Sequence, residues 1–350
     1  MVFSYYVAGN TAAGRVNVFA SNVEEFNRII VLKHPSPRVK TNCLHAWMEQ
    51  HLDEQTHIEL FESVEGKPFL DGVIVREEKV AIISDTVLDD LVKNTHTIDL
   101  SSYILETENR LQNVKEYEEK KESMLEKAWE SFATGLRIHD DLEHIYIQHM
   151  DFDKADQVAK EWKKRYLPKE HKQNQQGHVR ERLFGTNTAE GSLNVVPEII
   201  DSFSVVHHVK GRAGTGKSFF MNTVADACIE LGYDIERYIC SFDPKSTDMI
   251  IVPALKLCMF DSTNPHEFTP HTDDVVIDLY EDTVEPGTDE RYEDAIQETT
   301  NKYKSFMKDG IEYLQKARLK QDAIDELYTN DFTAKVTSSI IDSIDKIRMK

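Results

Sequence analysis

Short apolar runs recur along the chain, and most of them end at a polar or glycine-containing stretch that is typical of a turn. Four such runs are "RIIVLK" (28–33), "EKVAIISDT" (78–86), "SVVHHV" (204–209) and "LKLCMFDST" (255–263). An apolar run of this length, bounded by turn residues, predicts a buried strand of the kind found in parallel sheets. Two further runs, "HTIDLSSYI" (96–104) and "DVVIDLY" (274–280), predict additional strands.

Two long segments have a different pattern, rich in charge and in residues that favour helices. They cover 108–150 and 289–328, and they contain few helix breakers apart from the single glycines Gly135 and Gly310. We expect each segment to fold into a helical hairpin that follows its own sheet domain. The charge runs are expected to lie on solvated faces. The alternative is that the hairpins dock an unknown protein partner.

The chain repeats itself. "NTAAGRVNV" (10–18) aligns with "NTAEGSLNV" (187–195), at an offset of 187 − 10 = 177 residues. The same offset aligns 58–86 with 235–263 without a gap. A period this long indicates a duplicated domain rather than a solenoid. The polar stretch "KEHKQNQQGHVRER" (169–182) predicts a linker, so we expect one domain over 1–170 and a second over 181–350.

The second half contains a glycine-rich loop, "GRAGTGKS" (211–218), that fits the pattern G-x-x-x-x-G-K-[ST]. Glycines let the backbone wrap a phosphate so that successive N–H groups point inward. An apolar run precedes the loop and a helical pattern follows it, which places a helix N-terminus against the anion. The candidate phosphate-binding residues are Gly211, Arg212, Ala213, Gly214, Thr215, Gly216, Lys217, Ser218 and Phe219.

Three side chains of this half are assigned to phosphate and metal chemistry. Lys217 is expected to contact the β and γ phosphates, and Ser218 to hold Mg²⁺ through its hydroxyl. Asp261, at the end of the apolar run 255–260, supplies the second metal ligand. Lys217 and Asp261 are therefore the principal catalytic candidates.

A residue that orients the attacking water is harder to assign, because Ser262 follows Asp261 where many ATPases of this kind have a glutamate. Glu267 and Asp243 are equal candidates for this base, and His266 is a candidate sensor of the γ-phosphate. Asp248 matches Asp71 in the first half, which favours a structural role such as a cap or turn.

At the same offset, "HPSPRVKT" (34–41) aligns with the glycine-rich loop. Lys40 and Thr41 are retained, but the three glycines are replaced by His34, Pro37 and Val39. The first half also has Ser84 opposite the metal acid Asp261. The sequence therefore predicts a degenerate phosphate loop in the first half. Arg38 is a hypothesis for an arginine that this half supplies to the other half's site.

Composition limits the classes of ligand and location. The formal net charge of −21 disfavours nonspecific nucleic-acid binding, although a local site can still hold a small anion. No run of 18 apolar residues predicts a membrane span, and the N-terminus has no secretion signal pattern. The four cysteines form no C-x-x-C pair, which is typical of core thiols in a reducing cytoplasm. The stretch "NKYK" (301–304) lacks the acid of a guanine reader, so adenine is the expected base.

At "KGRAGTGKS", "FDPKSTDMIIVP" and "FDSTNPHEF", the chain resembles an uncharacterised bacterial family of tandem P-loop proteins described as ATPases or nucleotide kinases. "NTAEG" and "HDDLEHIYIQHMDF" extend the resemblance over nearly the whole chain. It implies an α/β fold with two P-loop NTPase-like domains, each a mainly parallel sheet flanked by helices with an appended helical hairpin. Members of the family have a glycine-rich loop in both halves, whereas this chain keeps it in one.

These observations predict an ATP-binding protein that uses Mg²⁺ and hydrolyses ATP at the second half, while the first half is structural or regulatory. One alternative is a nucleotide-gated binding or scaffold protein with little turnover, favoured by the missing glutamate beside Asp261. Another is a kinase that passes the γ-phosphate to a nucleotide or other small acceptor. The absence of a lid segment with clustered arginines weakens the kinase alternative.

Overall fold

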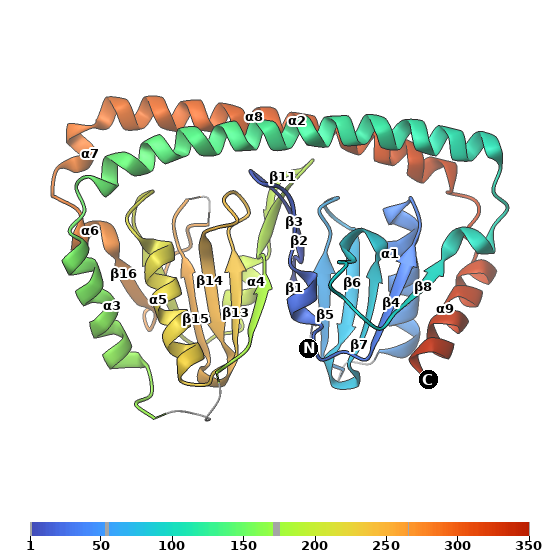
Figure 1. The fold of residues 1–350 in the computed structure, drawn as a ribbon, viewed down its shortest axis with the longest axis horizontal. Coiled ribbons are helices and arrows are strands. Elements are labelled where there is room, and N and C mark those ends of the chain that lie inside the picture. Colours follow the sequence, from blue (N-terminus) through green and yellow to red (C-terminus); the bar gives the residue numbers. More distant parts are fainter. Residues whose placement is uncertain (1, 53–55, 171–175, 265, 350) are drawn as a thin grey trace.

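The computed structural model describes residues 2–52, 56–170, 176–264 and 266–349. Two six-stranded sheets stand side by side beneath a pair of long helices (Figure 1). In sheet order, the first consists of β1 (Val2–Tyr5), β5 (Ile58–Glu62), β6 (Leu70–Val75), β7 (Val80–Ser84), β4 (Arg28–Lys33) and β8 (Thr95–Asp99). In the corresponding order, the second consists of β9 (Val179–Arg182), β13 (Ile235–Ile239), β14 (Thr247–Val252), β15 (Leu257–Asp261), β12 (Val206–Lys210) and β16 (Val275–Asp278).

Both sheets are mixed and mostly parallel. β6 and β14 run antiparallel to both of their neighbours, and the other pairings are parallel. Every residue of β6, β7 and β14 is buried, which explains why these strands are nearly continuous apolar runs. The α/β class, the mostly parallel sheets and two similar sheet domains that fit a duplication are therefore confirmed. β9 occupies the last four residues of the polar stretch 169–182, of which residues 171–175 lie outside the described residues.

A short hairpin from each half meets its counterpart at the centre of the molecule. The hairpins are β2 (Ala8–Thr11) with β3 (Gly14–Asn17), and β10 (Gly185–Thr188) with β11 (Gly191–Asn194). The side-chain amide of Asn10 donates to the carbonyl of Asn187 at 2.9 Å, and that of Asn187 donates to the carbonyl of Asn10 at 3.0 Å. Because these asparagines occupy equivalent positions of the repeat, the halves are related by an approximate two-fold axis, as in a homodimer.

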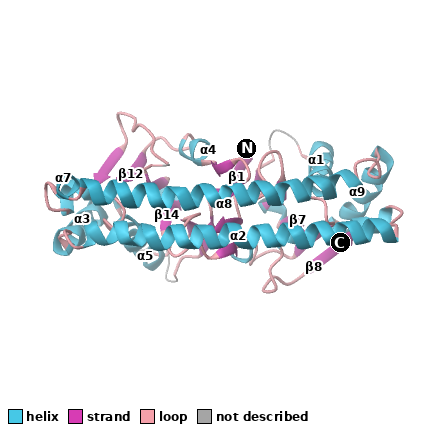
Figure 2. Cartoon of the chain, turned by 90° about the horizontal axis from the view of Figure 1, so that it is seen from above, coloured by secondary structure: helices cyan, strands magenta, loops and turns pink. Residues whose placement is uncertain are grey.

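The two long helices are α2 (Glu108–Ile147) and α8 (Glu293–Leu327), and they pack against each other along most of their length (Figure 2). α2 runs from the first sheet to the second and leads into α3 (Phe152–Tyr166), which packs on the second half. α8 runs back and leads into α9 (Ala334–Arg348), which packs on the first half. The expectation of one helical hairpin after each sheet is therefore wrong, since each long helix pairs with the helix of the other half.

The single glycines inside the two charged segments explain this difference. Neither is a turn, because both lie within uninterrupted helices. A Cβ atom at Gly310 of α8 would overlap the ring of Phe132 of α2, which is fully buried between the helices. Gly310 thus makes room for a large ring between the helices, although a glycine inside a helix lowers the stability of that helix.

The remaining elements are helices that pack on the sheets and short turns that connect strands or helices. They are η1 (Phe19–Asn22), α1 (Pro37–His51), η2 (Arg76–Glu78), η3 (Asp85–Val87), η4 (Leu100–Tyr103), α4 (Val196–Ile200), α5 (Lys217–Glu230), η5 (Pro253–Leu255), α6 (Leu279–Thr283) and α7 (Thr288–Arg291). One apolar core lies between the two halves, a second joins the first sheet to α1 and α9, and a third joins the second sheet to α3 and α5. The core of the first sheet therefore includes α9, which follows α8 of the second half. The core of the second sheet includes α3, which follows α2 of the first half.

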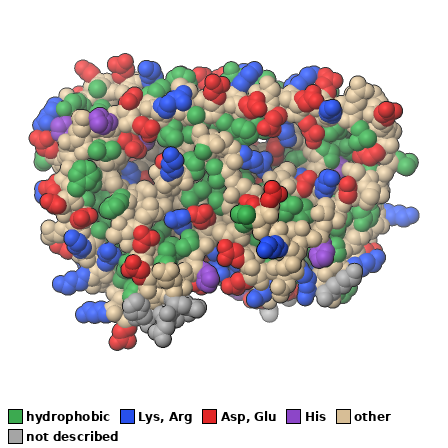
Figure 3. All heavy atoms as spheres, viewed as in Figure 1, with side chains coloured by type: hydrophobic (Ala, Val, Ile, Leu, Met, Phe, Trp, Pro, Cys, Tyr) green, Lys and Arg blue, Asp and Glu red, His purple; other side chains and the backbone are tan. Residues whose placement is uncertain are grey.

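Within the described part of the chain, no helix combines the length and apolarity needed to cross a membrane. On the face shown in Figure 3, lysine and arginine side chains lie among aspartates and glutamates. That mixture agrees with the solvated character expected of the charged segments.

Candidate functional site

The glycine-rich loop of the second half lies at the carboxyl ends of the parallel strands β12 and β15. Val209, near the end of β12, pairs with Asp261, the last residue of β15. The antiparallel strand β14 begins at this same edge with Thr247 and Asp248. In open α/β sheets this edge is the usual place for a ligand.

The loop follows β12 and ends at the first residue of α5. Gly214 and Gly216 have φ angles of +75° and +80°, in the left-handed region that a side chain with a Cβ disfavours. Gly216 is the N-cap of α5, so the helix begins at Lys217 with its first N–H groups facing the loop.

The first half replaces this loop by helix. α1 begins at Pro37, which aligns with Gly214, so it starts three residues earlier in the repeat than α5, whose first residue corresponds to Lys40. Ser36 caps α1 by accepting a hydrogen bond from the Val39 amide at 3.2 Å. The substitutions for glycine therefore extend the helix through the turn that forms the loop in the second half.

The aligned lysines have different partners. Lys217 Nζ donates to the Arg212 carbonyl at 2.8 Å and lies 3.6 Å from Asp261 Oδ2, and its side chain is 12% exposed. Lys40 Nζ lies 2.6 Å from Asp85 Oδ1, and its side chain is 2% exposed. Lys40 is thus held by a carboxylate of its own half, while Lys217 is bound more loosely at the mouth of the loop.

The aligned hydroxyls keep one contact in both halves. Ser218 Oγ accepts from the Thr247 amide at 2.7 Å, and Thr41 Oγ1 accepts from the Leu70 amide at 3.1 Å. This contact fixes the start of each helix to the antiparallel strand. It leaves a hydroxyl lone pair of Ser218 for a further partner, since a hydroxyl oxygen can accept twice.

Asp248, which the sequence assigns a structural role, lies at this same edge of the sheet beside Asp261. It is buried, and its pKa is raised to about 7, first by burial and then by the charge of Asp261, while Lys217 acts in the opposite direction. The interpretation of Asp248 as a cap or turn residue is wrong, since it is an interior residue of β14. Its counterpart Asp71 is also buried with a raised pKa.

The raised pKa of Asp248 predicts a specific dependence of stability on pH. Between about pH 4 and pH 7 the folded protein keeps a proton on Asp248 that the unfolded chain has lost, so the free energy of unfolding falls as the pH rises through this range. We expect the Asp248→Asn variant to lack this component of the pH dependence. Urea unfolding of both proteins at pH 5 and pH 8, without divalent cations, measures it. If the free energy of unfolding changed by the same amount between pH 5 and pH 8 in both proteins, the prediction would be contradicted.

The oxygen donors at this edge of the sheet decide whether it can hold Mg²⁺. No group of three or more histidine, cysteine, aspartate or glutamate residues is placed to hold a metal ion within the described ranges. Ser218 and Asp261 nevertheless provide the hard oxygen donors that Mg²⁺ takes, and Mg²⁺ often binds through one or two carboxylates plus phosphate oxygens. Asp261 also raises the pKa of Asp248, so a cation here would relieve repulsion between two carboxyl groups. The residues therefore fit the ion.

The two predicted base residues and the predicted γ-phosphate sensor have different surroundings. Glu267 is 60% exposed and lies 3.5 Å from Lys210 Nζ on the surface. His266 is largely buried against the ring of Phe184, and burial lowers its pKa. Asp243 accepts from the Ser246 hydroxyl at 2.9 Å and so closes a turn. Among the described carboxylates, Asp248 is better placed than Glu267 to act beside the loop.

The remaining loop residues divide between internal and external contacts. The Thr215 hydroxyl donates to the Arg212 carbonyl at 2.9 Å and so closes the loop. Ala213 and the side chain of Arg212 line a cavity beside the loop, while Phe219 is exposed on the first turn of α5. Arg38 lies at the first-half loop, 3.6 Å from Asp325, rather than at the second-half loop as hypothesised.

The end of α2, which belongs to the first half, packs against the glycine-rich loop of the second half. A Cβ atom on Gly214 would lie 2.5 Å from the carbonyl oxygen of Glu143, and one on Gly216 would lie 3.1 Å from Cε of Met150. Glu143 is partly buried, and this burial raises its pKa. The glycines therefore also make room for a helix that covers the outside of the loop.

The first half has the matching arrangement with α8. The Ser36 hydroxyl donates to Asp325 Oδ1 at 2.5 Å, and the ring of His34 packs against that of Tyr328 at 4.4 Å. The similarity of "HDDLEHIYIQHMDF" (139–152) to "QDAIDELYTNDF" (321–332) was the signal for this, since these are the two covering segments. The sequence did not show that each covers the loop of the other half.

Comparison of the chain with protein-family models, with curated proteins and with solved structures found no match.

Proposed function

We propose that the second half binds ATP with Mg²⁺ at the loop 211–218 and hydrolyses it, while the first half serves as a structural partner. The observation that carries the proposal is the pair of left-handed glycines, Gly214 and Gly216, directly before a helix that begins with a lysine at the carboxyl edge of a parallel strand. Inward N–H groups, a helix N-terminus and an ammonium group together favour a polyphosphate.

The roles follow from the contacts. Lys217 would exchange its carbonyl and Asp261 partners for the β and γ phosphates. Ser218 and Asp261 would hold the Mg²⁺, which neutralises charge on the phosphates as the terminal bond breaks. Asp248, with a pKa of about 7, is the carboxylate best suited to accept a proton from the attacking water.

A nucleotide-gated binding protein with little turnover remains the second candidate. It is favoured by the position of Glu267, which is exposed and paired with Lys210 rather than turned to the loop. It is also favoured by the crossing of α2, which places a helix of the first half directly on the loop.

Titration calorimetry with ATP and a phosphate-release assay test both candidates on the wild-type protein. We expect ATP to bind in Mg²⁺ and more weakly when EDTA removes the metal, since the Ser218 and Asp261 oxygens act on phosphate through the cation. Metal-dependent phosphate release would establish the ATPase, and binding without release would favour the gated protein. No detectable binding of ATP at millimolar concentration would reject the proposal.

A further inference from the structure

Arg212 of the glycine-rich loop is held by a specific pair of neighbours. Its Nε and Nη2 atoms lie 3.1 and 2.9 Å from Oδ2 of Asp289, which belongs to α7. The other oxygen of Asp289 accepts from the Tyr146 hydroxyl of α2 at 2.8 Å. Asp289 therefore joins the loop to the end of the helix that comes from the first half, and both of its carboxylate oxygens are used.

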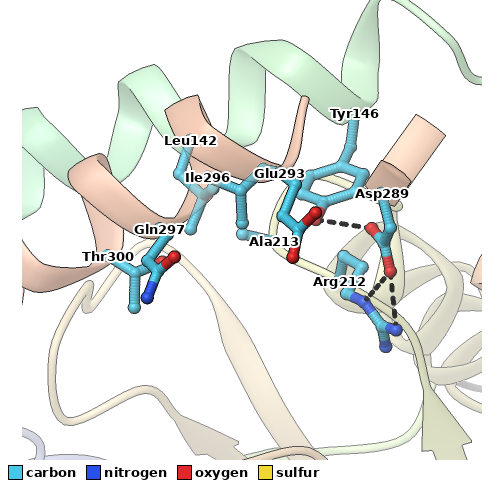
Figure 4. Close-up of a pocket in the computed structure, with 9 residues that line it drawn as sticks. All are labelled: Leu142, Tyr146, Arg212, Ala213, Asp289, Glu293, Ile296, Gln297 and Thr300. Atoms are coloured by element: carbon cyan, nitrogen blue, oxygen red, sulfur yellow. Dashed lines mark hydrogen bonds and ion pairs between the residues drawn. The ribbon is translucent and has the colours of Figure 1, made fainter. Parts of the chain in front are cut away.

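We call the group of three residues Arg212, Asp289 and Tyr146 the latch. Arg212 also stacks on the ring of Tyr280, with its Cζ 4.6 Å from the ring centroid. The three latch residues line a cavity of about 510 Å³ between the loop and the two long helices (Figure 4). The guanidinium, which is about half exposed, therefore has room to turn away from Asp289.

The latch lies beside the place where the terminal phosphates would bind. Lys217, the residue that contacts β and γ phosphates in such loops, donates to the carbonyl of Arg212 itself at 2.8 Å. A phosphate bound by Lys217 would therefore lie beside the backbone of Arg212, and the Arg212 side chain would have to turn from Asp289 to meet it. The fork geometry of arginine suits phosphate as well as it suits carboxylate.

Among the described residues, the first half has no group of arginine, aspartate and tyrosine of this kind, and Asp325 of α8 lies instead 3.6 Å from Arg38. The residue aligned with Arg212 is Pro35, whose carbonyl accepts a neutral hydrogen bond from Gln321 at 3.1 Å. The tyrosine aligned with Tyr146 is Tyr328, which packs against His34 instead. The charged latch thus occurs in the half that kept its glycines, where an anion can compete for the arginine.

We propose that the latch reports the terminal phosphate of a bound nucleotide to the first half. The phosphate competes with Asp289 for Arg212. When Arg212 turns to the phosphate, Asp289 and the Tyr146 hydroxyl bonded to it are no longer tied to the loop, so the end of α2 loosens from the loop. The inference rests on the proposed nucleotide site and adds its regulation. A ligand can shift a conformation only through differential contacts, and here the differing contact is the partner of Arg212.

Calorimetry with ATP on Asp289→Asn tests the competition. Without its carboxylate rival, Arg212 is free for phosphate, and we expect ATP to bind about tenfold more tightly, within the range of typical coupling between sites. Glu293→Gln is the matched control, because Glu293 lines the same cavity and loses the same charge but is not part of the latch. In an Arg212→Ala background, Asp289→Asn should change the affinity little.

Hydrogen exchange of the α2 amides at residues 142–147 tests the second step. ATP should increase their exchange in the wild type, and Asp289→Asn should show the increased exchange before ATP is added. If ATP binds the wild type but Asp289→Asn and Glu293→Gln raise the affinity equally, the effect is general charge and the latch is rejected. Unchanged α2 exchange also rejects it. Failure of the wild type to bind ATP rejects the nucleotide site itself.

Discussion

Replacing Lys217 by alanine is expected to weaken ATP binding by at least about 100-fold, which corresponds to about 3 kcal/mol. The ammonium group stands at the mouth of the loop, 12% exposed, with one carbonyl and one carboxylate near it. It can therefore exchange these partners for phosphate oxygens without leaving a buried group unsatisfied. Calorimetric titration of ATP in Mg²⁺ gives the affinity.

The chain offers a matched control at the aligned lysine of the first half. Lys40→Met keeps the length of the side chain, and we expect it to leave ATP affinity unchanged because Lys40 is enclosed and paired with Asp85. Gly216→Val copies the residue of the first half, Val39, into a position with φ of +80°, and should abolish binding through strain in the loop. Binding that survives Lys217→Ala but is lost in Lys40→Met would place the site in the first half.

Asp85→Asn is expected to lower the free energy of unfolding by about 3 kcal/mol, because it leaves the buried ammonium of Lys40 without a counter-charge. The 2.6 Å ion pair and the 2% exposure of Lys40 carry this expectation. Lys40→Met should cost less, since the Asp85 side chain is 30% exposed and can be solvated. Urea unfolding at fixed pH measures both variants.

Asp261, the carboxylate that lies near the aligned lysine of the second half, supplies the contrast. Asp261→Asn should cost less than about 1 kcal/mol, because Lys217 keeps the Arg212 carbonyl at 2.8 Å and is partly exposed. The same variant should weaken Mg²⁺-dependent ATP binding. Equal losses of stability in Asp85→Asn and Asp261→Asn would show that the two lysines have the same structural role, and would contradict the assignment of Lys217 to phosphate binding and of Lys40 to the core.

Local features of the fold were readable because short-range chemistry dictates them. The apolar runs at 28–33 and 255–260 became β4 and β15, since a strand buried on both faces must be apolar throughout. The 177-residue offset relates the starts of most strands in the two halves, such as Ile58 of β5 and Ile235 of β13. The left-handed glycines Gly214 and Gly216 sit where the loop pattern placed them.

The path of the long helices was not readable in the same way. A charged, amphipathic segment with one glycine fits a hairpin and an uninterrupted helix equally well. The choice depends on whether Gly310 forms a turn or makes room for the ring of Phe132. Phe132 belongs to a helix about 180 residues away in the chain, so the local sequence around Gly310 does not show which occurs. Pairing of α2 with α8 buries the apolar stripes of both, which neither segment can achieve alone.

The candidate site shows the same division. Lys217 and Ser218 were assigned from their spacing in one strand–loop–helix unit, and Asp261 from its place at the end of an apolar run, which became the neighbouring strand β15. Glu267 and Asp243 were equal candidates for the base, yet Glu267 is 60% exposed beside Lys210 and Asp243 closes a turn with Ser246. Asp248 was interpreted as a cap or turn residue because the antiparallel direction of β14, which carries it to the carboxyl edge of β15, leaves no mark in the sequence.

The sequence by itself determined the duplication, the α/β class and which half kept a glycine-rich loop, since these follow from periodicity, alignment and the φ angles that only glycine adopts readily. Only the tertiary structure decided that α2 of one half covers the loop of the other and ties it through Tyr146 and Asp289 to Arg212. These two contacts join residues 77 and 143 positions apart (289 − 212 and 289 − 146), and their partners are selected by packing of the whole chain rather than by any local pattern.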